Sequence, residues 1–169
     1  VTLTNGSMII LDVALSSGVP LVGCMNSNAS NYDPLANTNT AFGGVVNPNI
    51  GTGAYFNANQ HLTFNSFVES KIVSAVVYAD NSNTITFELR DNTSTIIDDT
   101  TITVLAGEQR LYFDFDVPVG NNYQLGIAGV NSGLYRNNGG VSYPYDIGGL
   151  IDITGSSAST SAYYYFYYD

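Results

Sequence analysis

The chain alternates apolar and polar residues over short runs, and helical periodicity is nearly absent. The clearest run covers residues 84–90, where Ile85, Phe87 and Leu89 fall on one face, and residues 110–117 repeat the scheme. A period of two places such side chains on one face of a β-strand. The same reasoning gives further candidate strands over residues 8–15, 61–64, 72–79, 95–104, 123–128, 150–154 and 163–168.

Turn-forming residues separate these runs, as at 80–83, 91–94 and 118–122. Strands recurring every 8–12 residues or so are typical of β-sandwiches. We therefore predict an all-β fold, an antiparallel β-sandwich of jelly-roll or immunoglobulin-like type. Its expected parts are an N-terminal strand segment (1–22), a long Asn/Gly-rich loop (23–50) and the sandwich itself (51–169).

Charge limits the kinds of partner that this chain can have. Its 169 residues include 14 acidic and only four basic side chains, for a net charge of −10. Four cations cannot neutralise a row of phosphates, so we expect no nucleic-acid partner. We also expect no membrane insertion, because no apolar run approaches the roughly 20 residues that a spanning helix needs.

Residues 23–36 hold the most distinctive motif. Gly23-Cys24, Ala29, Asn31-Tyr32-Asp33-Pro34 and Ala36 resemble the short calcium-binding, thrombospondin-type-3-like repeat of secreted proteins from Bacteroidetes-type bacteria. The resemblance implies a calcium site formed by Asn26, Asn28, Asn31, Asp33, Asn37 and Asn39.

The loop departs from that motif in ways that bear on calcium. Asp33 is its single carboxylate, and calcium affinity rises with carboxylate count. The alternative is a linker in which Asn side chains satisfy local backbone groups. Loss of the motif's second cysteine leaves Cys24 either as a small buried hydrophobe or as the partner of a cysteine on another chain.

Residues 52–169 look like a β-sandwich accessory domain of the same Bacteroidetes-type secreted and cell-surface proteins. The resemblance is carried by residues 53–56, 119–126, 134–138, 143–145 and 163–169. It implies export to the extracellular space or cell surface and a non-catalytic role.

The sequence contains few residues that could serve in catalysis. His61 is the single histidine, with no nucleophile motif around it. The acid pairs are Asp98 with Asp99 and Asp114 with Asp116. A glycosidase needs one carboxyl that keeps its proton, whereas Asp114 and Asp116 alternate with core aromatics on a face where water keeps acids ionised. We therefore expect no enzyme.

The segment 134–145 is the best candidate for a binding loop. Sugars are held by aromatic faces and by hydrogen bonds from Arg, Asn and Asp to hydroxyls. Both ingredients are supplied by Tyr135, Arg136, Asn137, Asn138, Tyr143 and Tyr145. In the alternative interpretation, Arg136 pairs with an acid such as Asp146 and the tyrosine hydroxyls pin the loop.

These observations favour a surface-exposed binding or adhesion module that contacts a polysaccharide or surface glycan. The alternative is a structural subunit or repeat of an extracellular filament, adhesin stalk or virion surface, joined to copies of itself or to neighbouring domains by β-strand contacts. The terminal segments motivate that alternative. Residues 1–15 hold an apolar strand that could be donated to a neighbour. Residues 163–168 are aromatic on both faces, so they either lie between two layers, offer one face to a partner or form an open sheet edge.

Overall fold

The computed structural model describes residues 22–23, 34–35 and 38–169, and the chain divides into two units, Val1–Thr40 and Ala41–Asp169. In the first unit, β1 (Val22–Gly23) pairs in parallel with β2 (Thr38–Asn39). The predicted strand 8–15 lies outside the described residues. So do Cys24 and five of the six expected calcium ligands, namely Asn26, Asn28, Asn31, Asp33 and Asn37.

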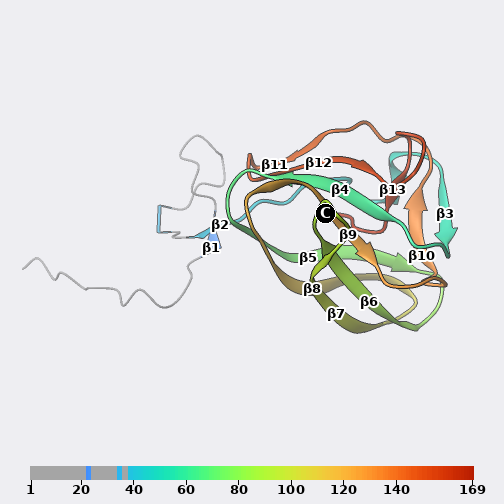
Figure 1. The fold of residues 1–169 in the computed structure, drawn as a ribbon. Coiled ribbons are helices and arrows are strands. Elements are labelled where there is room, and N and C mark those ends of the chain that lie inside the picture. Colours follow the sequence, from blue (N-terminus) through green and yellow to red (C-terminus); the bar gives the residue numbers. More distant parts are fainter. Residues whose placement is uncertain (1–21, 24–33, 36–37) are drawn as a thin grey trace, which may run out of the picture. The chain divides into compact units, whose positions relative to one another are not determined.

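The second unit is an antiparallel β-sandwich, which confirms the predicted fold class (Figure 1). One sheet contains β3 (Gly53–Phe56), β5 (Ser70–Ala79), β8 (Gly107–Val117), β10 (Leu134–Asn137) and β13 (Tyr164–Tyr165). The other has the order β11 (Tyr145–Ile147), β12 (Ile151–Ser156), β4 (His61–Ser66), β9 (Gly120–Ile127), β6 (Asn83–Arg90) and β7 (Ile96–Val104). A single 3-10 turn, η1 (Pro48–Ile50), precedes β3. No helix among the described residues is long and apolar enough to cross a membrane.

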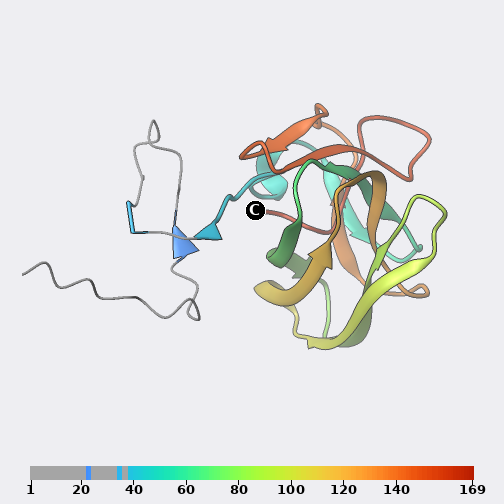
Figure 2. The same ribbon diagram turned by 60° about the vertical axis from the view of Figure 1, so that its left-hand side comes forward.

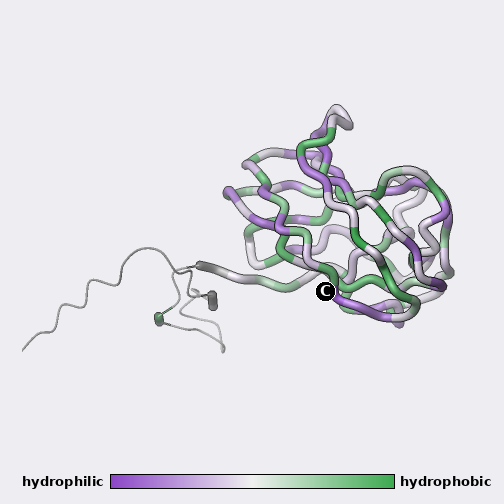
Figure 3. Tube along the Cα trace, turned by 90° about the horizontal axis from the view of Figure 1, so that it is seen from below, coloured by the Kyte–Doolittle hydropathy of each residue, from purple (hydrophilic) through white to green (hydrophobic). Residues whose placement is uncertain are grey.

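The core forms where the inward positions of the two sheets meet. Along β6 the alternation buries Ile85, Phe87 and Leu89, as the sequence predicts. The ring of Phe87 meets that of Phe113 on β8 with centroids 5.2 Å apart, joining the two sheets. Figure 3 shows hydrophobic and hydrophilic stretches interleaved along the same strands. Burial of each such aromatic side chain contributes about 1.5–3 kcal/mol to stability.

The C-terminal aromatic run lies inside the sandwich. All five residues from Tyr164 to Tyr168 are buried, so the run lies between layers, the first of the three possibilities that the sequence allows. Residues of β13 pair with β10, and the backbone of Tyr168 exchanges hydrogen bonds of 2.7 and 2.9 Å with Val76 on β5. The run therefore fills the space where β10 and β5 separate, and the chain ends at the side of the sandwich, next to Val45 in the segment that precedes β3 (Figure 2).

Three strands of the second unit were not among those predicted, namely β3, β10 and β11. Each has only three or four residues, too few to show a period of two. Their place comes from pairing: β10 has β3 along one side and shares its other side between β5 and β13. The second unit also takes in residues 41–50, which the sequence assigns to a loop. Val45 is buried there, and its carbonyl accepts a 3.0 Å hydrogen bond from the backbone of Asp169.

Candidate functional site

A row of aromatic side chains crosses the outer face of the five-stranded sheet. Tyr135 on β10 lies opposite Tyr55 on β3, and their rings meet edge to face with centroids 5.4 Å apart. Tyr78 on β5 lies opposite Glu108 on β8. Leu134 pairs with Ala79, which places Tyr135 and Tyr78 at neighbouring positions across β10 and β5. The row Tyr55–Tyr135–Tyr78–Glu108 therefore runs across β3, β10, β5 and β8.

Strand alternation turns these side chains outward. On β5, Ala75, Val77 and Ala79 are buried in the core, so Val76 and Tyr78 must face the other way. Tyr78 packs edge to face on the buried ring of Tyr168, with centroids 5.4 Å apart. Burial, followed by the negative charge of Glu108, raises the pKa of the Tyr78 hydroxyl. The C-terminal run thus holds the Tyr78 ring in place from the side.

The row lies in an open groove with a volume of about 960 Å³. Its floor includes Val76 and Tyr78, and residues 46–49 line it together with Gln109, Arg110 and Asp169. The side chain of Asn47 accepts a 2.9 Å hydrogen bond from the backbone of Asn49, which holds the start of η1 in place. The groove thus combines tyrosine rings with carboxylate and amide groups.

Arg110 is the single cation that lines this groove, and its guanidinium is already occupied. Nη2 forms an ion pair with the carboxylate of Asp169, and Nη1 donates to Ser74 Oγ at 3.1 Å and to the Asp169 carbonyl at 3.3 Å. Glu108 is exposed at the end of the tyrosine row. Of the two carboxylates that line the groove, Asp169 is therefore paired with a cation and Glu108 is not.

The structure distributes the six residues of the predicted binding loop over different environments. Tyr135 lines the groove. Arg136 is turned to the opposite side of β10, where its guanidinium carbon lies 4.9 Å from the ring centroids of both Phe56 and Tyr163. Among the described residues it forms no ion pair with Asp146, whose carboxylate instead accepts from the Gly149 backbone at 2.8 Å.

Asn137 and Asn138 support the segment between η1 and β3. Asn137 is fully buried and donates from Nδ2 to the carbonyls of Pro48 at 2.8 Å and Thr52 at 3.3 Å. The backbone of Asn138 donates to the Thr52 carbonyl at 2.8 Å. With its amide oriented to satisfy both neighbours, Asn138 Oδ1 accepts from Arg136 Nη1 at 2.8 Å.

Tyr143 and Tyr145 pack against Tyr164, with ring centroids 6.1 and 5.8 Å from its ring. The Tyr143 hydroxyl donates to the Tyr163 carbonyl at 2.7 Å, and the Tyr145 hydroxyl accepts from the Ser142 backbone at 3.1 Å. Burial raises the pKa of Tyr143 far above its usual value. These hydroxyls hold the chain around β11, as the alternative interpretation of this segment proposes.

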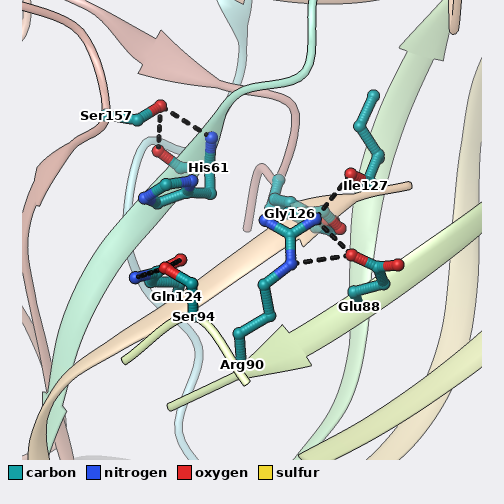
Figure 4. Close-up of polar contacts among 9 residues, drawn as sticks. His61, Glu88, Arg90, Ser94, Gln124, Gly126, Ile127 and Ser157 are labelled. Atoms are coloured by element: carbon teal, nitrogen blue, oxygen red, sulfur yellow. Dashed lines mark hydrogen bonds and ion pairs between the residues drawn. The ribbon is translucent and has the colours of Figure 1, made fainter. Parts of the chain in front are cut away.

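A second polar cluster lies on the outer face of the six-stranded sheet (Figure 4). Arg90 on β6 donates from Nε to Glu88 at 2.7 Å and from Nη2 to the Ile127 carbonyl at 2.8 Å, and both charged side chains are about nine-tenths buried. Gly126 leaves room for that guanidinium, because a Cβ there would lie 3.2 Å from Arg90 Nη1. His61 lies opposite Gly126, and burial followed by the charge of Arg90 lowers its pKa.

The other residues that the sequence singles out lie on strand surfaces. Asp114 and Asp116 are exposed on β8, where Asp114 has a φ of 57° at a bulge and Asp116 pairs with Lys71 at 2.8 Å. Asp99 is exposed on β7 beside the half-buried Asp98. Asn39, the sixth expected calcium ligand, belongs to β2. Within the part of the chain that the structure describes, no three His, Cys, Asp or Glu side chains gather as metal ligands do.

Sequence reasoning missed Tyr55, Tyr78 and Glu108 as members of one row. The outward position of Tyr78 is readable from the alternation over 72–79. The pairing that brings it beside Tyr135 and Glu108 is not, because partners on neighbouring strands are far apart in the chain. Comparison with known proteins adds no assignment: no family model, curated protein or solved structure matches this chain.

Proposed function

We propose that this protein is a non-catalytic binding module that holds an extracellular polysaccharide or surface glycan in the groove over the five-stranded sheet. The observation that carries the proposal is the row of three tyrosines across β3, β10 and β5, which ends at an exposed carboxylate on β8. Tyr55 remains 48% exposed at the β3 end of the row, where its ring meets that of Tyr135. Such exposure leaves an aromatic surface for a ligand to cover.

The groove has the two kinds of group that sugar recognition needs. Tyrosine rings pack on the apolar C–H faces of a sugar, and polar side chains bind its hydroxyls. Glu108 can accept two hydrogen bonds from neighbouring hydroxyls, while Asn47 and Asn49 supply both donors and acceptors. The volume of about 960 Å³ is at the upper end of the range for ligand sites, as an extended ligand requires.

The proposal keeps Tyr135 from the predicted binding loop and gives the other five residues a supporting role. Arg136 is enclosed between two rings, and Asn137 is fully buried. Tyr143 and Tyr145 direct their hydroxyls to the protein backbone. A sugar could reach these groups only by displacing contacts that hold the fold.

The groove favours binding over hydrolysis. Its second carboxylate, Asp169, is engaged by Arg110, so it does not stand opposite Glu108 as a free partner. Hydrolysis of a glycosidic bond requires two carboxyl groups that flank the bond, one of them protonated. The resemblance of residues 52–169 to secreted accessory domains supports a location outside the cell.

Two matched tyrosine substitutions test this function. Tyr55→Ala removes a ring from the groove, whereas Tyr112→Ala removes a ring that is 65% exposed on β8 and does not line the groove. In affinity electrophoresis against a panel of polysaccharides, the Kd derived from retardation should rise about tenfold in Tyr55→Ala, a loss of about 1.4 kcal/mol of binding free energy. Tyr112→Ala should leave it unchanged. Retardation by no polysaccharide, or equal loss in both variants, would contradict the proposal.

Assembly through β-strands, the alternative function, receives less support from the sheet edges that the structure describes. Strand β7 carries Asp98 and Asp99 at the edge of its sheet, and β8 is bulged at Asp114. The edges formed by β3 and β11 have only four and three residues. Charges, bulges and short edge strands all oppose the addition of a further strand.

A further inference from the structure

We infer that the groove selects an uncharged polysaccharide chain and excludes acidic glycans. This inference deepens the proposed function and rests on it. It concerns the charge of the ligand, which the tyrosine row alone does not determine.

The groove has no free cation to offer an acidic sugar. A carboxylate or sulfate ligand is normally held by a bidentate guanidinium or by an ammonium group. Arg110 is the single basic side chain among the groove's lining residues, and it is bound to Asp169 and Ser74. To accept an acidic sugar it would have to release the Asp169 carboxylate, which would then be left beside the incoming negative charge.

No basic residue elsewhere on the described sandwich is free to reach the groove. Lys71 forms an ion pair with Asp116 and donates to the carbonyl of Asp114 at 2.9 Å. Arg90 is paired with Glu88 on the other sheet. Arg136 is stacked between Phe56 and Tyr163. Each of the four basic side chains of the chain is therefore already engaged.

A negative charge remains exposed in the groove. Glu108 stands at the end of the tyrosine row, on a chain with a net charge of −10. Like charges brought together at a binding site reduce affinity and slow association. Hydroxyl groups of a neutral sugar instead donate hydrogen bonds to the same carboxylate. Glu108 thus serves as an acceptor for uncharged chains and as a barrier to acidic ones.

The experiment compares neutral and acidic oligosaccharides of equal length on the unmodified protein by isothermal titration calorimetry at low ionic strength. The neutral set contains β-linked and α-linked gluco-, manno- and xylo-hexasaccharides, and the acidic set contains oligouronates and heparin hexasaccharides. We expect the best neutral ligand to bind at least about tenfold more tightly than any acidic one. Added salt should reduce this ratio of Kd values, because it screens the repulsion between the groove and the acidic ligand. Acidic ligands that bind as tightly as neutral ones would overturn the inference while leaving glycan binding intact. Binding of neither set would instead contradict the proposed function.

A charge variant adds a second, independent readout. Glu108→Gln keeps the shape and removes the charge, and the exposed Glu69→Gln, outside the groove, is its matched control. The first variant should raise the affinity for oligouronates roughly three- to tenfold, and the control should not change it. An unchanged preference in Glu108→Gln would mean that this carboxylate does not exclude acidic ligands.

Discussion

The hydroxyl of Tyr168 donates a hydrogen bond of 2.9 Å to Oδ1 of Asn137, and both side chains are fully buried. Asn137 in turn donates to the carbonyls of Pro48 and Thr52. One side chain therefore joins the C-terminal run, β10 and the segment before β3. These are the elements that position Tyr55, Tyr135 and Tyr78 in the groove.

Loss of this junction should destabilise the fold. Asn137→Ala leaves the buried Tyr168 hydroxyl and the Pro48 carbonyl without this partner, while the Thr52 carbonyl keeps its hydrogen bond from the Asn138 backbone. Each unsatisfied buried group costs about 1–3 kcal/mol. We expect urea denaturation to show a free energy of unfolding lower by about 2–4 kcal/mol. Asn92→Ala, in an exposed turn, should change it by less than about 0.5 kcal/mol. An equally small effect at Asn137 would show that the junction does not stabilise the sandwich.

Arg136 should contribute to stability and not to ligand affinity. Arg136→Ala removes a guanidinium that lies 4.9 Å from each of two ring centroids, and such contacts contribute up to about 2 kcal/mol when they are shielded from water. We expect reduced thermal stability together with unchanged polysaccharide affinity, measured below the unfolding transition. If Arg136→Ala kept full stability but lost binding, Arg136 would instead contact the ligand, as the sequence suggests.

His61 should titrate below its ordinary pKa of about 6.5, because burial and the charge of Arg90 both oppose its protonation. The unfolded state then binds the proton more tightly. The stability associated with His61 is thus fully present above about pH 6.5 and is lost as the pH falls through the lowered pKa of the folded state. The chain has one histidine, so its NMR titration is unambiguous. A measured pKa at or above the ordinary value would contradict the described burial. The slope of stability with pH should also be shallower in His61→Gln.

The buried tyrosines should resist ionisation. Burial raises the pKa values of Tyr164, Tyr167 and Tyr168, so the folded state disfavours their charged form. Unfolding releases that penalty, and stability is therefore expected to fall as the pH rises above the ordinary tyrosine pKa of about 10. Tyrosinate absorbance should rise in two phases, the second together with loss of the near-ultraviolet circular dichroism. A single phase near the ordinary pKa, with the fold retained, would be inconsistent with a buried C-terminal run.

The strands that build the core could be predicted because they are long enough to alternate. Phe87 and Phe113 each sit in a run of apolar residues at every second position, and such a run indicates its own buried face. The register in which neighbouring strands pair leaves no comparable pattern in the sequence. Tyr55, Tyr78 and Tyr135 become neighbours only through the pairing of β3, β10 and β5, and their sequence positions carry no sign of it.

The predicted binding loop shows the same limit on predicting contacts from the sequence. Residues 134–145 hold the right chemistry for sugar binding, yet β10 pairs on both sides and turns Tyr135 and Arg136 to opposite faces. Composition can indicate that a segment contains ligand-binding groups. It cannot indicate that the side-chain amide of Asn137 already hydrogen-bonds to Pro48, Thr52 and Tyr168.

The location of the binding face can be mapped directly by NMR, by titrating the labelled protein with the neutral oligosaccharide that binds best. We expect amide shift changes concentrated at Tyr55, Tyr135, Tyr78 and Glu108 on the five-stranded sheet. We expect none at Glu88, Arg90 and Gly126 on the other sheet. Changes centred on that other sheet, or on residues 143–147, would contradict binding in the groove.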